Sequence, residues 1–138
     1  MKKLIIATHG ELAQGFKNAL ELIAGSTAQE ITTYSLVPGK SATDFMAEIA
    51  KEMHAQPEQQ FIIMGDLYGA SIVNAMLSLG HYPNGVLLSG VNLGLALQVL
   101  LDGSEVISDA TIDEMIAEAQ QGIRRIQLDH EALVDEDF

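Results

Sequence analysis

Residues 3–10 read Lys-Leu-Ile-Ile-Ala-Thr-His-Gly, a short apolar run with β-branched residues that stops at a histidine and a glycine. Such a run is typical of a strand buried in a parallel sheet. Apolar residues at helical spacing follow, from Leu12 to Ile23, and Gly25 is a suitable residue just past the end of a helix. The stretch therefore predicts a strand followed by a helix, the first half of a βαβ unit.

The same alternation repeats along the chain. The strands that it predicts are residues 3–8, 30–37, 60–64 and 85–89. The helices that it predicts are residues 12–23, 41–53, 72–79, 92–101 and 111–122. Ser41-x-x-Asp44 and Thr111-x-x-Glu114 resemble capping boxes, so Ser41 and Thr111 are expected to cap their helices. Residues 123–128 fit either the end of the last helix or a fifth strand.

Strands that alternate with helices of this length indicate an α/β fold with helices on both faces of a mainly parallel sheet. With right-handed crossovers, the simplest arrangement is a doubly wound sheet of strand order 2-1-3-4. In that order the first and third strands are neighbours, and their following helices leave on opposite faces. The crevice at the carboxyl ends of these two strands is where such sheets bind ligands.

Composition limits the classes of function. The chain has 138 residues, 48 % of them hydrophobic, no cysteine and a net charge of −12. Too few cations are present to neutralise phosphates, so we expect no nucleic-acid partner. The apolar runs are short or interrupted, so we expect a cytoplasmic protein without a signal peptide or membrane insertion. Residues 102–138 hold eleven acids and two bases. We expect one domain at residues 1–128 and an acidic, solvated tail at residues 129–138.

His9 and Asp66 follow the two strands that border the expected crevice. A nucleophilic histidine needs one ring nitrogen free and a partner that holds the proton on the other, and an aspartate on the neighbouring strand end supplies this. Without such a pairing, His9 is an ordinary polar loop residue and Asp66 an ordinary cap. His54, His81 and His130 have no such setting and are expected on the surface.

If the transferred group is phosphoryl, its oxygens require N–H groups at helix starts. Gly10, Gly69 and Ala70 are small enough to allow the backbone to approach, and are the expected phosphoryl-binding positions. Ser71 is expected either to contact the phosphoryl group or to cap its helix.

Other chemistries lack their residues. Dinucleotide-binding, P-loop, zinc-protease and serine-hydrolase motifs are missing from the sequence, and the histidines do not have metal-ligand spacing. We expect no metal. Thr8-His9-Gly10-Glu11 is similar to the Arg-His-Gly-Glu motif of histidine phosphatases, but Thr8 replaces the arginine that grips phosphate. The phosphatase interpretation is therefore rejected.

Three motifs resemble those of the mannose-family enzyme IIA proteins of the bacterial phosphoenolpyruvate-dependent sugar phosphotransferase system. The motifs begin at Ile5 (IIATHGxxAxG), at Asp66 (DLxGASxxN) and at Ser89 (SGVNL). The likeness runs nearly end to end. It implies that His9 accepts a phosphoryl group from HPr and passes it to an enzyme IIB, and that Asp66 holds the other ring nitrogen. Ser71 is implied as a phosphoryl contact, and no cofactor is implied.

The resemblance also implies partners. Enzyme IIB is expected to be a separate polypeptide, because only ten residues follow Leu128, and to work with the membrane proteins IIC and IID. A homodimer is expected, with residues 123–128 as an antiparallel strand exchanged between subunits. The sequence departs from the family pattern at Ala70, where a glycine is usual, and at Ile72, where a proline is usual. Ala70 restricts the loop if a positive φ is required there.

The sequence leaves two alternatives open. The phosphocarrier subunit of phosphoenolpyruvate-dependent dihydroxyacetone kinase has the same fold and a similarly placed histidine, although its relatives favour Ser-His-Ser where this chain has Thr8-His9-Gly10. The other alternative is a regulatory binding module in which His9 is never phosphorylated.

Overall fold

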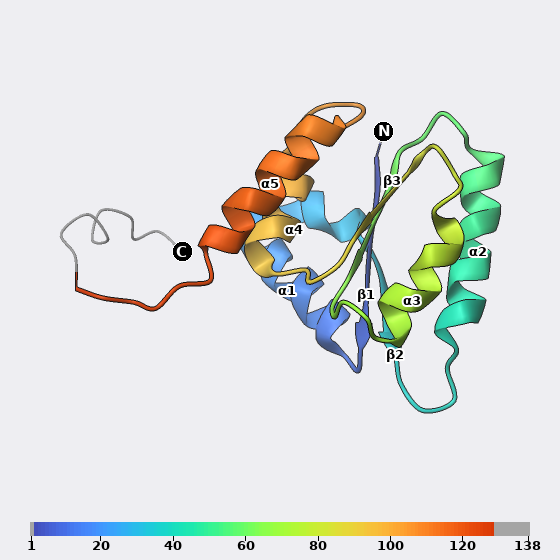
Figure 1. Ribbon diagram of the computed structural model, residues 1–138, viewed down its shortest axis with the longest axis horizontal. Helices are drawn as coiled ribbons and strands as arrows, with labels where there is room; N and C mark the ends of the chain where they lie inside the picture. Colours follow the sequence, from blue (N-terminus) through green and yellow to red (C-terminus); the bar gives the residue numbers. More distant parts are fainter. Residues whose placement is uncertain (1, 129–138) are drawn as a thin grey trace.

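Four parallel strands form one sheet in the order β2-β1-β3-β4, as the sequence predicted (Figure 1). The computed structural model describes residues 2–128. The strands are β1 (Lys3–His9), β2 (Thr32–Leu36), β3 (Phe61–Gly65) and β4 (Gly85–Leu88). The register pairs Ala7 with Gly65, so β1 and β3 end close together at the carboxyl edge of the sheet.

Helices cover both faces of the sheet (Figure 1). The helices are α1 (Leu12–Ala24), α2 (Ala42–Ala55), α3 (Ser71–Met76), α4 (Leu93–Leu101) and α5 (Asp109–Gln121), with short 3₁₀ turns η1 (Gly25–Glu30) and η2 (Leu77–Leu79). Helices α1, α4 and α5 lie on one face, and α2 and α3 lie on the other. The third predicted helix, residues 72–79, is thus divided between α3 and η2.

Two apolar cores result from the alternation of side chains along each strand. Ile6 and Ile62 are fully buried against α1, α4 and α5, whereas Ile5 and Ile63 are fully buried against α2 and α3. All five residues of β3 are buried. Burial on both faces explains why the strands read as continuous apolar runs rather than as alternating ones.

The starts of the helices confirm one capping prediction and correct another. Ser41 caps α2, because its Oγ accepts a hydrogen bond from the Asp44 N–H at 3.2 Å. The last helix begins earlier than predicted, since Ser108 is its cap and its Oγ accepts from the Thr111 N–H at 3.2 Å. Thr111 therefore lies in the first turn of α5, and the prediction that it caps the helix was wrong.

Gln60 joins the amino end of β3 to the loop that precedes α5. Its amide nitrogen donates to the Ile107 carbonyl and its amide oxygen accepts from the Ile107 N–H, both at 2.9 Å. The Gln60 side chain is 8 % exposed, so both polar atoms need these partners. The Gln60 amide thus pairs with both backbone groups of Ile107, as a neighbouring strand would. It ties the loop before α5 to the amino end of β3, which is the end of the sheet opposite to His9.

Residues 123–128 form no regular element, and α5 ends at Gln121. The side chains of Ile123, Ile126 and Leu128 are 78, 90 and 95 % exposed. In the single chain, residues 123–128 are therefore neither the end of the last helix nor a fifth strand. The expected acidic tail, residues 129–138, and His130 within it lie outside the described residues.

Candidate active site

The carboxyl edge of the sheet brings His9 and Asp66 together. His9 is the last residue of β1, and Asp66 follows the last residue of β3, its neighbour in the sheet. Helix α1 then leaves on one face of the sheet and α3 on the other. His9 and Asp66 therefore lie where the connections after two neighbouring strands leave on opposite faces of the sheet, as the predicted strand order requires.

One carboxylate oxygen of Asp66 holds His9 in two ways. Oδ2 accepts a hydrogen bond from the His9 backbone N–H at 2.9 Å, and the same oxygen lies 2.9 Å from His9 Nδ1. The His9 side chain is 46 % exposed, whereas that of Asp66 is 11 % exposed. The arrangement fixes the imidazole through one nitrogen and leaves the rest of the ring accessible.

The environment keeps Asp66 ionised. Burial by itself raises the pKa of Asp66, but the hydrogen bonds from the His9 backbone and ring, with the charge of the ring, lower it more. The net result is a pKa below the ordinary 3.8. Among the described residues, the second carboxylate oxygen, Oδ1, is buried without a hydrogen-bond partner. An ionised carboxylate only accepts hydrogen bonds, so the proton of neutral His9 belongs on Nδ1.

Ser71 approaches His9 from α3. Its Oγ lies 3.5 Å from His9 Nε2, the nitrogen that Asp66 does not hold. The cap position of α3 is occupied by Ala70, and no side chain caps this helix, so the predicted alternative that Ser71 caps it was wrong. Ser71 is the first helical residue, which leaves its hydroxyl free to lie beside the histidine.

The backbone N–H groups near His9 are only partly available. The Gly10 N–H donates to the Leu36 carbonyl at 2.8 Å, and the Ala70 N–H donates to the Leu67 carbonyl at 3.2 Å. In this arrangement both amides already have carbonyl acceptors within the fold. The first carbonyl bond of α3 comes from the Asn74 N–H, so the N–H groups of residues 71–73 have no carbonyl partner within the helix.

Backbone geometry explains which small residues the loops require. Gly10 and Gly69 have φ angles of 54° and 82°, in the left-handed region that favours glycine. Ala70 has a φ of −92°, which any residue adopts. Alanine in place of the usual glycine therefore strains nothing at this position.

Asn74 has a structural role that the sequence did not predict. Its Nδ2 donates to the Gly69 carbonyl at 3.2 Å and so closes the loop between Asp66 and α3. Only its place in the motif after Asp66 could have drawn attention to it. His54 and His81 are exposed, as predicted. Among residues 2–128, no three His, Asp or Glu side chains gather as potential metal ligands.

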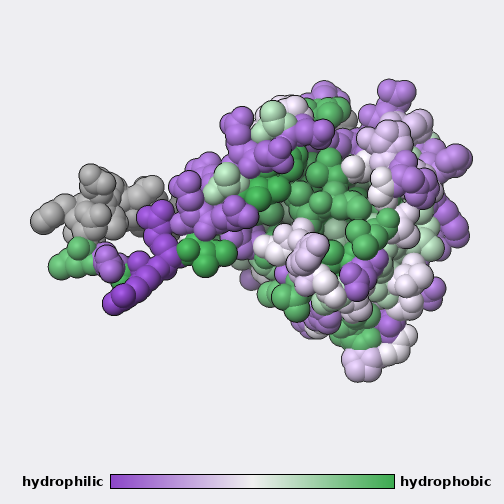
Figure 2. All heavy atoms as spheres, in the orientation of Figure 1, coloured by the Kyte–Doolittle hydropathy of each residue, from purple (hydrophilic) through white to green (hydrophobic). Residues whose placement is uncertain are grey.

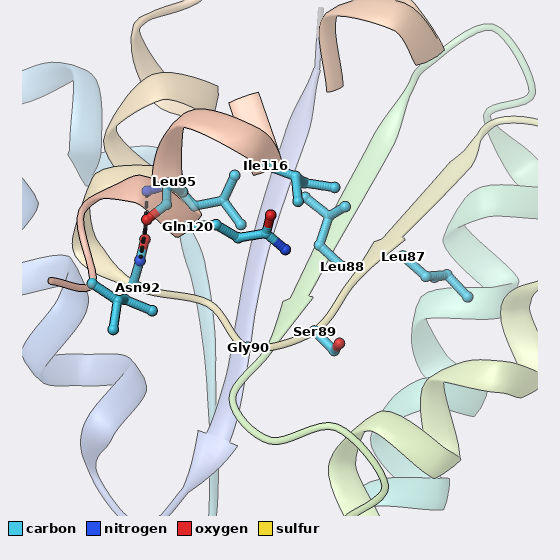
Figure 3. A pocket seen from close by; sticks show the side chains of 10 residues that line it. Leu87, Leu88, Ser89, Gly90, Asn92, Leu95, Ile116 and Gln120 are labelled. Atoms are coloured by element: carbon cyan, nitrogen blue, oxygen red, sulfur yellow. Dashed lines mark hydrogen bonds between the residues drawn. The ribbon is translucent and has the colours of Figure 1, made fainter. Parts of the chain in front are cut away.

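A cleft of about 380 Å³ lies beside β4 (Figure 3). His9, Asp66 and Ser71 do not line it. It is lined by the end of β4, the start of α4 and one face of α5, including Leu88, Leu95 and Ile116. Ile123, where the exposed segment 123–128 begins, forms part of its wall. Figure 2 shows that hydrophobic residues gather on this side of the molecule, between α5 and α3.

Comparison with known proteins assigns the family. The model of the mannose-type EIIA family, described as the PTS system fructose IIA component, matches residues 3–129. This chain belongs to the mannose-type EIIA family. It is therefore an EIIA component of the sugar phosphotransferase system, which implies a role in phosphoryl transfer.

Relatives of this EIIA protein agree in sequence and in fold. A sorbose-specific EIIA component of Klebsiella pneumoniae is 28 % identical over 109 residues, covering 78 % of each chain. The crystal structure of an EIIA component from Streptococcus agalactiae is 26 % identical, with a TM-score of 0.77 over 91 % of this chain and 97 % of that one. A mannose/sorbose-specific IIA subunit from Enterococcus faecalis, 23 % identical, has the same fold, with a TM-score of 0.79 over 94 % and 98 % of the two chains. Within residues 2–128 of this EIIA protein, no helix is long and apolar enough to cross a membrane.

Proposed function

We propose that this EIIA protein is a phosphohistidine carrier, in which His9 accepts a phosphoryl group from phospho-HPr and passes it to an enzyme IIB. The observation that supports this is the 2.9 Å distance between His9 Nδ1 and Asp66 Oδ2. Because the carboxylate keeps the proton on Nδ1, the Nε2 lone pair is free to act as the nucleophile. Nε2 is also the nitrogen beside the Ser71 hydroxyl.

In the proposed step, the Nε2 lone pair of His9 attacks the phosphorus of the HPr phosphohistidine. A new N–P bond forms while the N–P bond of the donor breaks, and its electron pair returns to the donor ring. The His9 ring gains positive charge, which the ionised Asp66 stabilises. Transfer to enzyme IIB repeats the exchange with His9 as the donor. Transfer between two phosphohistidines is nearly balanced in free energy, so positioning and fixed dipoles are sufficient without a cofactor.

The phosphoryl oxygens need donors that the fold does not already use. The Ser71 hydroxyl and the unpaired N–H groups at the start of α3 are the best candidates, whereas Gly10 and Ala70 already donate within the fold. An anion at a helix start gains about 0.3–1 kcal/mol, enough to favour the phosphorylated state without trapping it. Gly69 brings the loop close, because it bears no side chain.

Exposed apolar side chains near the carboxyl edge supply a surface for brief encounters with both partners. Leu67 and Tyr68 follow Asp66 and are exposed, and Leu93 begins α4. The acidic character of the chain would attract a basic IIB surface and speed association more than it tightens binding. Enzyme IIB would then pass the group on, with the membrane proteins IIC and IID moving the sugar. Such a carrier works in the cytoplasm.

The functional unit in this proposal is a homodimer in which residues 123–128 of each chain pair with β4 of the other. Strand β4 is the edge of the sheet, and its free side borders the cleft of Figure 3. Apolar side chains of the segment are almost fully exposed in the single chain. Pairing of residues 123–128 with β4 of the partner would cover both the free edge of β4 and the apolar side chains of the segment.

The carrier role is tested by intact mass spectrometry at alkaline pH, which preserves an acid-labile N–P bond. The protein is incubated with phosphoenolpyruvate, enzyme I and HPr, next to His9→Ala and to His81→Ala, which removes an exposed histidine elsewhere. We expect one phosphoryl group on the wild type and on His81→Ala, and none on His9→Ala. Absence of phosphorylation of the wild type by an active HPr would refute the proposal.

A further inference from the structure

Thr8 lies in β1, and its polar side chain is fully buried against the start of α1. Its relative exposure is 0 %, and its Oγ1 accepts a hydrogen bond from the Ala13 N–H at 2.6 Å. The hydroxyl cannot reach solvent or a bound phosphoryl group. The hydroxyl therefore acts through the backbone that its hydrogen bond holds in place.

This hydrogen bond replaces a missing cap. Glu11 occupies the cap position of α1 but makes no side-chain cap bond. The first carbonyl bond of the helix comes from the Gly15 N–H to Glu11, so the N–H groups of residues 12–14 have no carbonyl partner in the helix. Thr8 supplies the acceptor for one of them from outside the helix, five residues away along the chain. It thereby joins the end of the strand directly to the start of the helix.

The loop that this bond closes contains His9. The loop runs from Thr8 to Ala13, and it is held at two other points: the His9 N–H donates to Asp66, and the Gly10 N–H donates to Leu36 of β2. Three hydrogen bonds, to α1, to β2 and to the β3 side of the site, thus fix the backbone that carries the imidazole. The Thr8 bond is the one among them whose acceptor is a side chain of β1 itself.

We propose that Thr8 is a positioning residue for phosphoryl transfer, acting through the turn that it closes onto α1. It holds the His9 backbone so that Nδ1 meets Asp66 while Nε2 stays beside Ser71. This inference rests on the function proposed above. Loss of the hydroxyl leaves the Ala13 N–H buried without an acceptor and frees the turn, and small misplacements of a nucleophile cost large factors in rate.

The test compares Thr8→Val and Thr8→Ala, which lack the hydroxyl, with Thr8→Ser, which keeps it. Whichever of the two hydroxyl-free variants folds is compared with Thr8→Ser. Ser41→Ala and Ser108→Ala are matched controls, because each removes a cap hydroxyl from a helix that does not follow His9. Three quantities are measured: the Tm, the kcat and KM for phosphorylation by phospho-HPr, and the proton distribution of the His9 ring from ¹⁵N NMR shifts.

We expect kcat to fall about tenfold in the hydroxyl-free variants with KM nearly unchanged, and the His9 ring to lose its preference for the proton on Nδ1. Thr8→Ser restores both, and the two control variants lose a similar amount of Tm without changing either. A hydroxyl-free variant with wild-type kcat and wild-type His9 spectrum would overturn the inference. So would a loss of kcat matched by the controls at equal Tm. The NMR comparison needs no donor, so it stands even if phospho-HPr fails to phosphorylate the wild type.

Discussion

Asp66 Oδ2 lies 2.9 Å from two nitrogens of His9, the backbone N and the ring Nδ1. A single oxygen therefore fixes both the main chain and the imidazole, and Asp66→Asn separates the effect of charge from that of shape. We expect phosphorylation of His9 to slow about 10- to 100-fold, because hydrogen bonds to charged groups are worth about 1.5–3 kcal/mol. Quenched-flow mass spectrometry measures the rate, with the exposed Asp113→Asn as a control that stays at the wild-type value.

The lowered pKa of Asp66 predicts how stability depends on pH. An acid whose pKa is lower in the folded state stabilises the fold above its ordinary pKa, and this contribution disappears as the pH falls through the folded value. The wild type should therefore exceed Asp66→Asn in free energy of unfolding near pH 7, and the difference should shrink as the pH falls below the ordinary 3.8. Urea unfolding of both proteins across this range provides the measurement. A difference that stays constant down to the lowest pH would contradict the assignment.

Ser71→Ala is expected to affect chemistry and leave stability unchanged. The hydroxyl lies 3.5 Å from His9 Nε2 and does not cap α3. We expect the phosphorylation rate to fall by less than about tenfold, since one neutral hydrogen bond is worth about 0.5–1.5 kcal/mol. Ser108→Ala should do the reverse, costing about 1 kcal/mol of stability by removing the cap of α5. Equal losses of stability in the two variants would show that Ser71 has a structural role after all.

The two small residues of the loop before α3 should respond in different ways. Gly69 has a φ of 82°, so Gly69→Ala forces an L-residue into the left-handed region and should cost about 1 kcal/mol. Ala70 already has an ordinary φ of −92°, and Ala70→Gly, which restores the usual family residue, should lose about 0.4–1 kcal/mol by loosening the unfolded chain. Thermal unfolding of the two variants measures both changes. A gain in stability from Ala70→Gly would mean that alanine strains the loop.

The proposed exchange of residues 123–128 predicts a dimer that a single charge disrupts. Ile126 is 90 % exposed in the single chain and would be covered after pairing with β4. We expect light scattering at micromolar concentration to give the dimer mass for the wild type and the monomer mass for Ile126→Asp. Gln127→Asp, next to it on the opposite face of an extended strand, serves as the control and should remain dimeric. A monomeric wild type would contradict the proposal.

The strand order and the pairing of His9 with Asp66 were predictable, because the alternation of strands and helices is visible in the sequence and right-handed crossovers leave few topologies. Strands buried on both faces read as apolar runs, and residues after neighbouring parallel strands meet at one edge. The start of α5 was predicted wrongly, because two hydroxyl residues near it could each act as the cap. Ser108 and Thr111 are spaced so that both fit a cap, and the sequence does not tell which hydroxyl accepts from which N–H.

The remaining features of the site depend on contacts between distant segments. Thr8 accepts from the Ala13 N–H at the start of α1, where Glu11 makes no side-chain cap bond. The Gly10 N–H is occupied by Leu36, a residue of another strand. Neither contact has a signature in the spacing of residues along the chain, since each is set by how the strand ends and the loops pack.

Strand β3 carries Gln60 immediately before its first residue and Asp66 immediately after its last. Gln60 holds the loop before α5 in place, and Asp66 orients the imidazole of His9. A contact that stabilises the fold and a contact that serves the proposed chemistry therefore lie at opposite ends of the five buried residues of β3. We therefore expect substitutions at the Gln60 end to change the stability of the fold without changing the chemistry at His9.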